Sequence, residues 1–305
     1  MTRQIYTIGE TVYDIIFENG EITAGKAGGS MLNTSVSLGR VGRDVCFITE
    51  LGDDNLGKTI MGFLKSNQVN TSFINQFDEG KTPVALAFLD EHKNASYTFY
   101  KQYPGQRLTR TFPEIRKDDI VLFGSFFGVN PEVRERVKTF VKSARDASAL
   151  IIYDPNIRHP KDHGMGKIIP AVLENFAFAD IIRASHEDFQ NLFDIDDPAT
   201  AFRLVRESSS ANLIYTHSSE FVFAATDDFQ EKYDVPKIDV ISTIGAGDNF
   251  NAGMIYHIIK QNHQKGELKA LNEKRWQAIV QSGIRFSAAV CRSWENYVDE
   301  GFSKG

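Results

Sequence analysis

The sequence predicts a three-layer α/β fold, in which helices cover both faces of a mostly parallel sheet. Short β-rich apolar runs alternate with longer amphipathic segments along most of the chain. This alternation indicates crossover connections, because parallel neighbours cannot be joined by a tight turn. The last third of the chain has the helical period over 248–261 and 273–292. These two observations predict the fold class before any motif is considered.

The expected strands and helices follow one another in a regular order. The β-rich runs are 4–8, 44–50, 119–123, 149–153, 181–183 and 212–216. The amphipathic segments between them are 31–40, 59–66, 132–145, 168–176 and 199–208. Two stretches, 11–26 and 82–103, alternate with the period of a strand, contain hairpin-like turns and lack a helix. We expect them to form one small antiparallel sheet that projects from the body; two unrelated surface hairpins are the alternative.

Length and composition limit the class of protein. At about 150 residues per domain, 305 residues suit two domains or one large α/β domain with an insertion. We expect one domain over 1–305, with the small sheet inserted as 10–27 and 80–110. Hydrophobic residues make up 42% of the chain and charged residues 24%, which excludes wholesale disorder. A net charge of -6 argues against a nucleic-acid-binding surface.

The sequence also indicates a compartment. The first nine residues lack the apolar core of a signal peptide, and no apolar run approaches the roughly 18 residues that span a bilayer. Cys46 and Cys291 lie far apart in apolar contexts, which is typical of reduced core thiols. We therefore expect a cytoplasmic protein with no membrane partner.

The segment 244–253, IGAGDNFNAG, carries the strongest signal. It follows a strand-like run at 240–243 and opens a long predicted helix. Gly245 and Gly247 let the backbone approach a ligand closely, and a helix N-terminus directs N–H groups and the positive end of its dipole toward that ligand. We expect an anion there, such as the phosphates of a nucleotide. A dinucleotide fingerprint is excluded, because Phe250 occupies its third glycine position.

Asp248 is the unusual residue of this segment. A carboxylate beside bound phosphates is useful as a base, which takes a proton from an attacking hydroxyl while the amides stabilise charge on the transferring group. The alternative is that Asp248 is only the helix N-cap. Gly253, further along the same helix, is expected to permit close packing on the sheet.

A second glycine cluster, AGGSMLN over 27–33, also precedes a predicted helix. Gly28 and Gly29 can expose amides, and Asn33 offers both a donor and an acceptor, which suits sugar hydroxyls. A turn followed by a capped helix is the alternative. Asp14 follows the first strand, at the edge where open parallel sheets bind ligands, and can accept hydrogen bonds from a polyol. A solvated acid is the alternative for Asp14.

A third segment, GDDNLGKT over 52–59, fits the phosphate-loop pattern GxxxxGK[ST] between a strand and a helix. Such a loop cradles phosphates with its backbone, so Asp53 and Asp54 would bring two negative charges against them. Each costs roughly 3 kcal/mol at a separation of ~5 Å and an effective dielectric constant of ~20. Electrostatics therefore disfavours a phosphate loop at this position.

The segment 153–158, YDPNIR, follows another predicted strand. It gathers Asp154, Asn156 and Arg158 at the carboxyl end of that strand. Arg158 is a candidate partner for a phosphate or a transition state, because its guanidinium matches the geometry of phosphate oxygens. A polar loop cap is the alternative.

Together these motifs resemble the PfkB (ribokinase-like) family of carbohydrate kinases, in the family's order and over essentially the whole chain. The resemblance implies a ribokinase-like three-layer sandwich with a small β lid, through which a homodimer can assemble. It also implies a kinase that uses ATP and Mg²⁺, with the metal bridging phosphates and held mostly through water. Gly9-Glu10 with Asp14 is more similar to fructokinases and 2-keto-3-deoxygluconate kinases than to ribokinases.

The resemblance implies a role for each motif. Asp248 would be the catalytic base, with the anion hole formed by Gly245, Ala246 and Gly247 and the transferring group near Arg158. The sugar would be held by Asp14, Gly28, Gly29 and Asn33. The nucleotide would be bordered by Ser185, Asp188, Thr216, Ser218, Thr243, Gly245 and Gly247. Asp188 would also help to hold Mg²⁺, mostly through water.

Three departures from the family pattern lie on the nucleotide side. They are Ser242 in place of an aspartate, 185–188 in place of Asn-x-x-Glu, and 216–218 in place of Thr-x-Gly. None removes the base or the anion hole, so we expect an ATP-dependent sugar kinase whose sugar is fructose. Kinases for 2-keto-3-deoxygluconate, ribose or a nucleoside are alternatives within the family. A non-catalytic sugar- or nucleotide-binding protein on the same scaffold is the alternative in another class.

Overall fold

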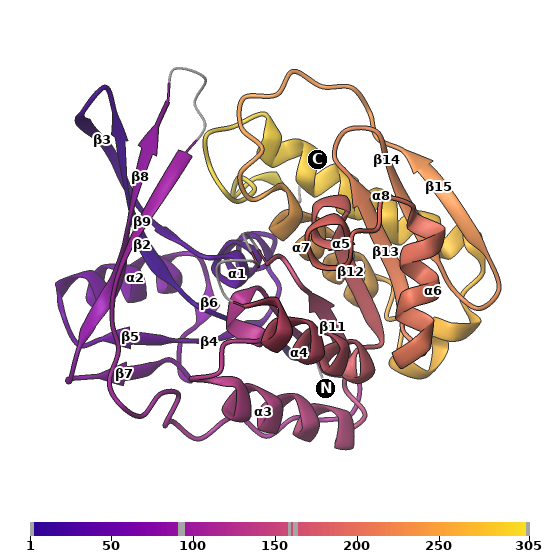
Figure 1. Cartoon of the computed structure of the whole chain (residues 1–305), viewed down its shortest axis with the longest axis horizontal. Coiled ribbons are helices and arrows are strands. Elements are labelled where there is room, and N and C mark those ends of the chain that lie inside the picture. Colours follow the sequence, from indigo (N-terminus) through magenta and orange to yellow (C-terminus); the bar gives the residue numbers. More distant parts are fainter. Residues whose placement is uncertain (1–2, 91–94, 158–159, 161–163, 303–305) are drawn as a thin grey trace.

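The main sheet of the protein is built almost entirely from parallel strands (Figure 1). The computed structural model describes residues 3–90, 95–157, 160 and 164–302. Within these residues the sheet has nine strands in the order β15-β14-β13-β12-β11-β10-β1-β4-β6. Their bounds are β1 (Ile5–Ile8), β4 (Val45–Ile48), β6 (Val69–Asn70), β10 (Ile120–Gly124), β11 (Leu150–Asp154), β12 (Ile181–Ser185), β13 (Asn212–His217), β14 (Phe221–Ala225) and β15 (Gln230–Asp234). Only β14 and β15 are antiparallel to their neighbours, so the predicted fold class is confirmed.

Helices cover both faces of this sheet because its strands are apolar on both sides. On β10, Ile120 and Leu122 belong to one buried cluster, whereas Val121 and Phe123 belong to the other. The first cluster includes side chains of α1 (Ser30–Arg40), α2 (Asn55–Ser66), α7 (Ala246–Lys260) and α8 (Glu273–Cys291). The second includes side chains of α3 (Arg134–Asp146), α4 (Met165–Phe178), α5 (His186–Phe193) and α6 (Pro198–Ser208). These three layers place the carboxyl ends of the parallel strands along one edge.

A second sheet projects from this body (Figure 1). This projecting sheet consists of β3 (Glu21–Gly28), β2 (Val12–Glu18), β8 (Lys81–Leu89) and β9 (Ala95–Gln102), in that order. The two helix-free stretches thus form one sheet, and the alternative of two unrelated hairpins is wrong. The sheet is mixed rather than antiparallel, because β2 and β8 join the two hairpins as parallel neighbours. In the first hairpin Asn19 and Gly20 have φ of 52° and 83°, while the turn of the second includes 91–94, outside the described residues.

Two further expectations about elements are wrong. The run 240–243 is not a strand, because the amides of Ile241 and Ser242 donate to the carbonyl of Cys291 instead of to a neighbouring strand. Gly253 does not pack on the sheet; a Cβ at this position would lie 2.4 Å from the carbonyl oxygen of Ser282 on α8. A two-stranded parallel sheet, β5 (Glu50–Gly52) with β7 (Asn75–Phe77), completes the body. None of the described helices is long and apolar enough to cross a membrane.

Candidate active site

Asp248 lies where the N-termini of two helices meet. Gly245, with φ of 79°, is the N-cap of α7, so Asp248 is the third residue of the helix and the N-cap alternative is wrong. The Asp248 side chain reaches α1, where Ser30 Oγ donates to Oδ1 at 2.5 Å and Asn33 Nδ2 donates to Oδ2 at 2.8 Å. The residue is 7% exposed. Sequence segments more than 200 residues apart thus meet at one carboxylate.

The first turn of α7 faces a cavity of about 380 Å³. Amides in the first turn of a helix have no acceptor within the helix, and together with the helix dipole they attract anions. The cavity is lined by Asn156, Ile157, Arg183, Ser185, Glu187, Asp188, Asn191, Thr243, Gly245, Ala246, Gly247 and Asp248. The predicted anion hole, the predicted base and three further nucleotide-side residues (Ser185, Asp188 and Thr243) therefore line one cavity.

Arg183 is the main residue of this site that sequence reasoning missed. It lies on β12, is 6% exposed, and its Nη1 is 3.1 Å from Asp154 Oδ2. Its Nη2 donates to Thr216 Oγ1 at 2.8 Å. A Cβ on Gly247 would lie 2.6 Å from Nη1, so the guanidinium packs directly beneath the glycine turn. A charged residue in an otherwise apolar strand was the available signal.

Asp154 carries the counter-charge of Arg183. It is fully buried, and Asn251 Nδ2 donates to its Oδ2 at 2.6 Å. Burial raises the pKa of Asp154 to about 7, although the nearby Arg183 charge lowers it. The contact with Asp154 fixes the orientation of the Arg183 guanidinium. This group therefore lies directly behind the glycine turn that would bind phosphates.

The residues expected to hold the sugar lie around the start of α1, and none of them lines the cavity at the first turn of α7. Asp14 lies on β2 of the projecting sheet, not at the end of the first strand as expected, because β1 ends at Ile8. A Cβ on Gly28 would lie 2.1 Å from Asp14 Oδ2, and one on Gly29, whose φ is 131°, would lie 2.5 Å from the Glu10 carbonyl oxygen. At Gly29 the positive φ and the backbone clash leave room for glycine alone, whereas a side chain at Gly28 would displace the Asp14 carboxylate. The two glycines let the projecting sheet run directly into α1.

Asn33 offers an acceptor to a ligand. Its Nδ2 is bound to Asp248, while its buried Oδ1 has no hydrogen-bond partner among the described residues. A buried polar atom without a partner costs free energy, which a ligand hydroxyl would recover. This observation favours a hydroxyl-bearing ligand next to Asp248.

The predicted nucleotide-side residues have different surroundings. Ser185 and Asp188 form the capping box of α5, and Asp188 Oδ1 also accepts from the amide of Ile157 at 3.2 Å. Thr216 reaches the site through Arg183. Ser218, with φ of 47°, lies in the turn after β13 and is not among the cavity-lining residues. Arg158 lies outside the described residues.

The segment 52–59 is a capped helix and not a phosphate loop. Asp54 is the N-cap of α2, and its Oδ1 accepts from the amide of Gly57 at 2.8 Å. The same carboxylate accepts from the amide of Thr82 at 2.8 Å. Lys58 is exposed on the surface, where its Nζ is 3.3 Å from Asp53. The carboxylate that would repel a phosphate thus serves the helix and the projecting sheet.

The oxygen donors around the cavity suit a hard cation. Among the described residues there is no group of three or more His, Cys, Asp or Glu side chains that could hold a metal ion. Glu187, Asp188 and Asn156 nevertheless line the cavity with carboxylate and amide oxygens, which are the ligands that Mg²⁺ accepts beside phosphates and water. The site therefore fits a Mg²⁺ ion that arrives with a nucleotide.

Comparisons with known proteins agree with this architecture. The model of the family described as pfkB family carbohydrate kinase matches residues 2–295. The chain is 29% identical over 235 residues to "Probable fructokinase-6, chloroplastic" of Arabidopsis thaliana, covering 75% of this chain and 61% of that protein. The fold is similar to that of aminoimidazole riboside kinase from Salmonella enterica in complex with aminoimidazole riboside and an ATP analogue (TM-score 0.84, 18% identity, 99% and 97% coverage). It is also similar to that of fructokinase with bound ATP from Xylella fastidiosa (TM-score 0.83, 19% identity, 97% and 94% coverage).

Proposed function

This chain belongs to the pfkB family of carbohydrate kinases, and we propose that it transfers the γ-phosphoryl group of ATP to a primary hydroxyl of fructose. One observation carries the proposal. The carboxylate of Asp248 lies between the first turn of α7, which suits phosphates, and Asn33, which suits a sugar hydroxyl. The fructokinase relatives support fructose as the sugar.

The reaction follows from this position of Asp248. The sugar hydroxyl gives its proton to the carboxylate as its oxygen attacks the γ-phosphorus in line, and the bond to the β-phosphate oxygen breaks to release ADP. The amides of 245–247 stabilise the charge on the transferring group. Ser30 and Asn33 hold the carboxylate at 2.5 and 2.8 Å, so its orientation is fixed before the sugar binds.

The remaining site residues divide between the two substrates. Asp14, Gly28, Gly29 and Asn33 hold the sugar. Arg183 and Thr243 flank the phosphates together with the glycine turn, and we include Arg158 near the transferring group. Mg²⁺ supplies charge neutralisation on the phosphate oxygens when bound. Because Asp188 already accepts hydrogen bonds from Ser185 and Ile157, we assign it a contact with the ion through water.

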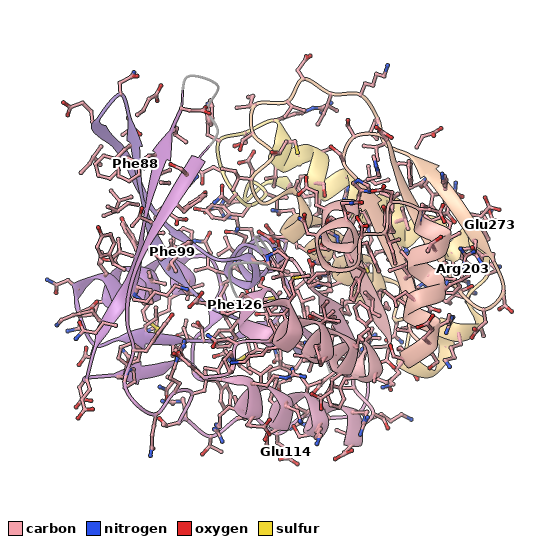
Figure 2. All side chains as sticks on the ribbon, viewed as in Figure 1. Phe88, Phe99, Glu114, Phe126, Arg203 and Glu273 are labelled. Carbon is pink, nitrogen blue, oxygen red and sulfur yellow. The ribbon has the colours of Figure 1, made fainter. Side chains whose placement is uncertain are left out.

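The projecting sheet would act as the lid of one domain over 1–305, with lid segments 10–27 and 80–110. A lid excludes water, which would otherwise accept the phosphoryl group. The sheet carries exposed aromatic side chains on both faces: Phe88, with Tyr100, lies on one face and Phe99 on the other (Figure 2 labels Phe88 and Phe99). Exposed aromatic residues of this density favour an interface, and we propose a homodimer through the lid. The buried free thiols of Cys46 and Cys291 support a cytoplasmic location.

A second sugar class has support from the same sheet. By strand register, Phe99 lies on the same face of the projecting sheet as Ala85 and Asp14. An aromatic ring on the face that carries Asp14 can stack on a planar base. An imidazole riboside, as in the Salmonella enterica complex, is therefore the second candidate substrate.

Release of ADP with Mg·ATP tests the proposal. The panel is fructose, ribose, 2-keto-3-deoxygluconate, fructose phosphates, adenosine, aminoimidazole riboside and no sugar. Stimulation by fructose alone supports the main proposal, and stimulation by the riboside supports the second candidate. A protein that binds fructose but releases no ADP with any member would be a binding protein on a kinase scaffold, contrary to the proposal.

A further inference from the structure

Lys26 connects the projecting sheet to the C-terminal segment 293–298. It lies on β3, and its Nζ donates to the carbonyl oxygen of Trp294 and to Oδ1 of Asn296, each at 3.2 Å. Both acceptors are neutral amide oxygens. At these two contacts the ammonium group therefore forms hydrogen bonds and no salt bridge. None of the roles proposed above for the site residues involves Lys26.

The segment 293–298 packs directly on the turn that precedes α7. The carbonyl oxygen of Asn296 accepts from Asn249 Nδ2 at 2.8 Å, and the same Nδ2 donates to the carbonyl of Gly245 at 2.8 Å. A Cβ on Gly245 would lie 2.7 Å from the Asn296 oxygen. Asn249 and Asn296 are 0% and 3% exposed. A displacement of Asn296 therefore displaces the glycine turn.

The same segment is fixed to α1 at its other end. The amide of Val298 donates to Ser37 Oγ at 3.2 Å, and Arg40 Nη1 donates to the Val298 carbonyl at 3.0 Å. Ser37 in turn donates to Asn249. Near the other end, Asn296 is held by Asn249 and, from the projecting sheet, by Lys26.

Side-chain packing does not fill the space around this contact. A cavity of about 580 Å³ lies beside it, lined by β3 residues including Lys26, by Ile60 and Phe63 of α2, and by Trp294, Glu295 and Tyr297. The cavity lies between β3, α2 and the C-terminal segment, so the contact of Lys26 is not enclosed by a packed apolar interface. The hydrogen bonds of Lys26 cross that space.

We propose that Lys26 is a positioning residue that fixes the Gly245–Asp248 turn through Asn296 when the projecting sheet covers the sugar. The inference rests on the proposed function, and it links the two substrates energetically. A sugar that holds the sheet over Asp248 keeps Lys26 on Asn296 and so orders the anion hole. Linkage is reciprocal, so the nucleotide tightens sugar binding by the same factor.

The test compares Lys26→Met, which keeps the aliphatic stem, with Lys26→Arg and with Lys81→Met as the matched control. Lys81 is an exposed lysine at the start of β8 in the same sheet. The affinity for a non-hydrolysable ATP analogue is measured with and without the sugar that the ADP assay identifies. We expect sugar to increase the affinity for the analogue by about tenfold in the wild type and in Lys81→Met. In Lys26→Met the increase should be about twofold or less. Lys26→Arg keeps the charge and the donors, so it should restore most of the coupling.

A second measurement needs no ligand. Hydrogen exchange of a peptide that covers 242–252 should be faster in Lys26→Met than in Lys81→Met, because the turn has lost its support. Asn296→Ala should show the same effect, and the double variant should add little to it. Equal exchange in Lys26→Met and the control overturns the inference. The inference is also overturned if sugar tightens binding of the ATP analogue to Lys26→Met as much as to the wild type. In that case phosphorylation of the sugar would still support the proposed function.

Discussion

At the scale of single residues, the proposed chemistry depends on one carboxylate. Asp248→Ala should lower kcat by about 10²–10⁴-fold, the usual contribution of a positioned base. Binding of the ATP analogue should change little, because the backbone amides of the first turn of α7 remain. Steady-state kinetics and calorimetry measure the two effects separately. Asp239→Ala, in the segment before the glycine turn, is the control, and near-normal turnover in Asp248→Ala contradicts the assignment of the base.

The buried pair of Asp154 and Arg183 predicts a pH dependence of stability. The pKa of Asp154 is raised from 3.8 to about 7 by burial, so the folded state binds a proton more tightly than the unfolded state does. Stability contributed by this group is then complete below pH 4 and falls as the pH rises toward 7. Relative to the wild type, Asp154→Asn should become steadily less destabilised over that window, by at most about 1.4 kcal/mol per pH unit. Urea unfolding at several pH values measures the difference; a difference that does not vary with pH refutes the raised pKa.

What the sequence predicted at this scale follows from local chemistry. Gly245, Gly247 and Asp248 could be found because a glycine turn before a helix has few other uses, and the structure places all three at one cavity. Arg183 was missed because its partners Asp154 and Thr216 come from neighbouring strands. No spacing along the chain reports which strands are adjacent. The contact between Asn33 and Asp248 could not be predicted either, because it joins residues 215 positions apart in the sequence.

At the scale of elements, the close packing of α7 on α8 depends on Gly253. A Cβ there would lie 2.4 Å from the Ser282 carbonyl oxygen and 2.9 Å from Gly283 Cα, and backbone cannot yield as a flexible side chain does. Gly253→Ala should therefore destabilise the protein by about 1–3 kcal/mol. Gly62→Ala on α2, where a Cβ meets nothing within 4 Å, should instead stabilise it by up to about 1 kcal/mol. Chemical denaturation measures both; a stabilised Gly253→Ala variant would show that α7 and α8 can separate without cost.

The edge strand β15 and the run 240–243 were mispredicted because burial and strand pairing do not coincide there. Buried parallel strands were found because both of their faces are apolar, as in β10 and β11. The edge strand β15 reads QEKYD and exposes four of its five residues, so its period carries little apolar signal. The run 240–243 has apolar residues without a neighbouring strand, and its amides pair with the end of α8. The apolar pattern of a sequence indicates which residues are buried. It does not indicate which segments pair as neighbouring strands.

At the scale of the whole molecule, the two sheets have different tasks. The nine-stranded sheet carries the body of the molecule, whereas the projecting sheet stands beside it and leads through β3 into α1 (Figure 1); we propose that it covers the sugar. Alternation of strand and helix predicted the first because each parallel crossover needs a helix. The two helix-free stretches predicted the second as one projecting sheet, but as an antiparallel one, since the parallel pairing of β2 with β8 joins segments about 70 residues apart. The order of strands in either sheet required the structure.

The exposed aromatic side chains of the projecting sheet predict how copies of the chain associate. Phe88 is 42% exposed and Tyr100 is 61% exposed, and strand register places both on one face. Water contact with such rings is costly, and burying one typically stabilises an interface by about 1.5–3 kcal/mol. Phe88→Ser with Tyr100→Ser should therefore weaken the proposed dimer by about 100-fold or more.

Sedimentation over a range of concentrations measures the dimer constant, with Trp294→Ser as the control. Trp294 is 62% exposed but lies on the C-terminal segment and not on the sheet. If the lid forms the dimer, the double variant is monomeric where the wild type and Trp294→Ser are dimeric. Because the same sheet would cover the sugar, the monomeric variant should also have a raised KM for sugar with little change in the KM for ATP. A wild type that stays monomeric at every concentration would mean that the aromatic face serves the lid of a single chain.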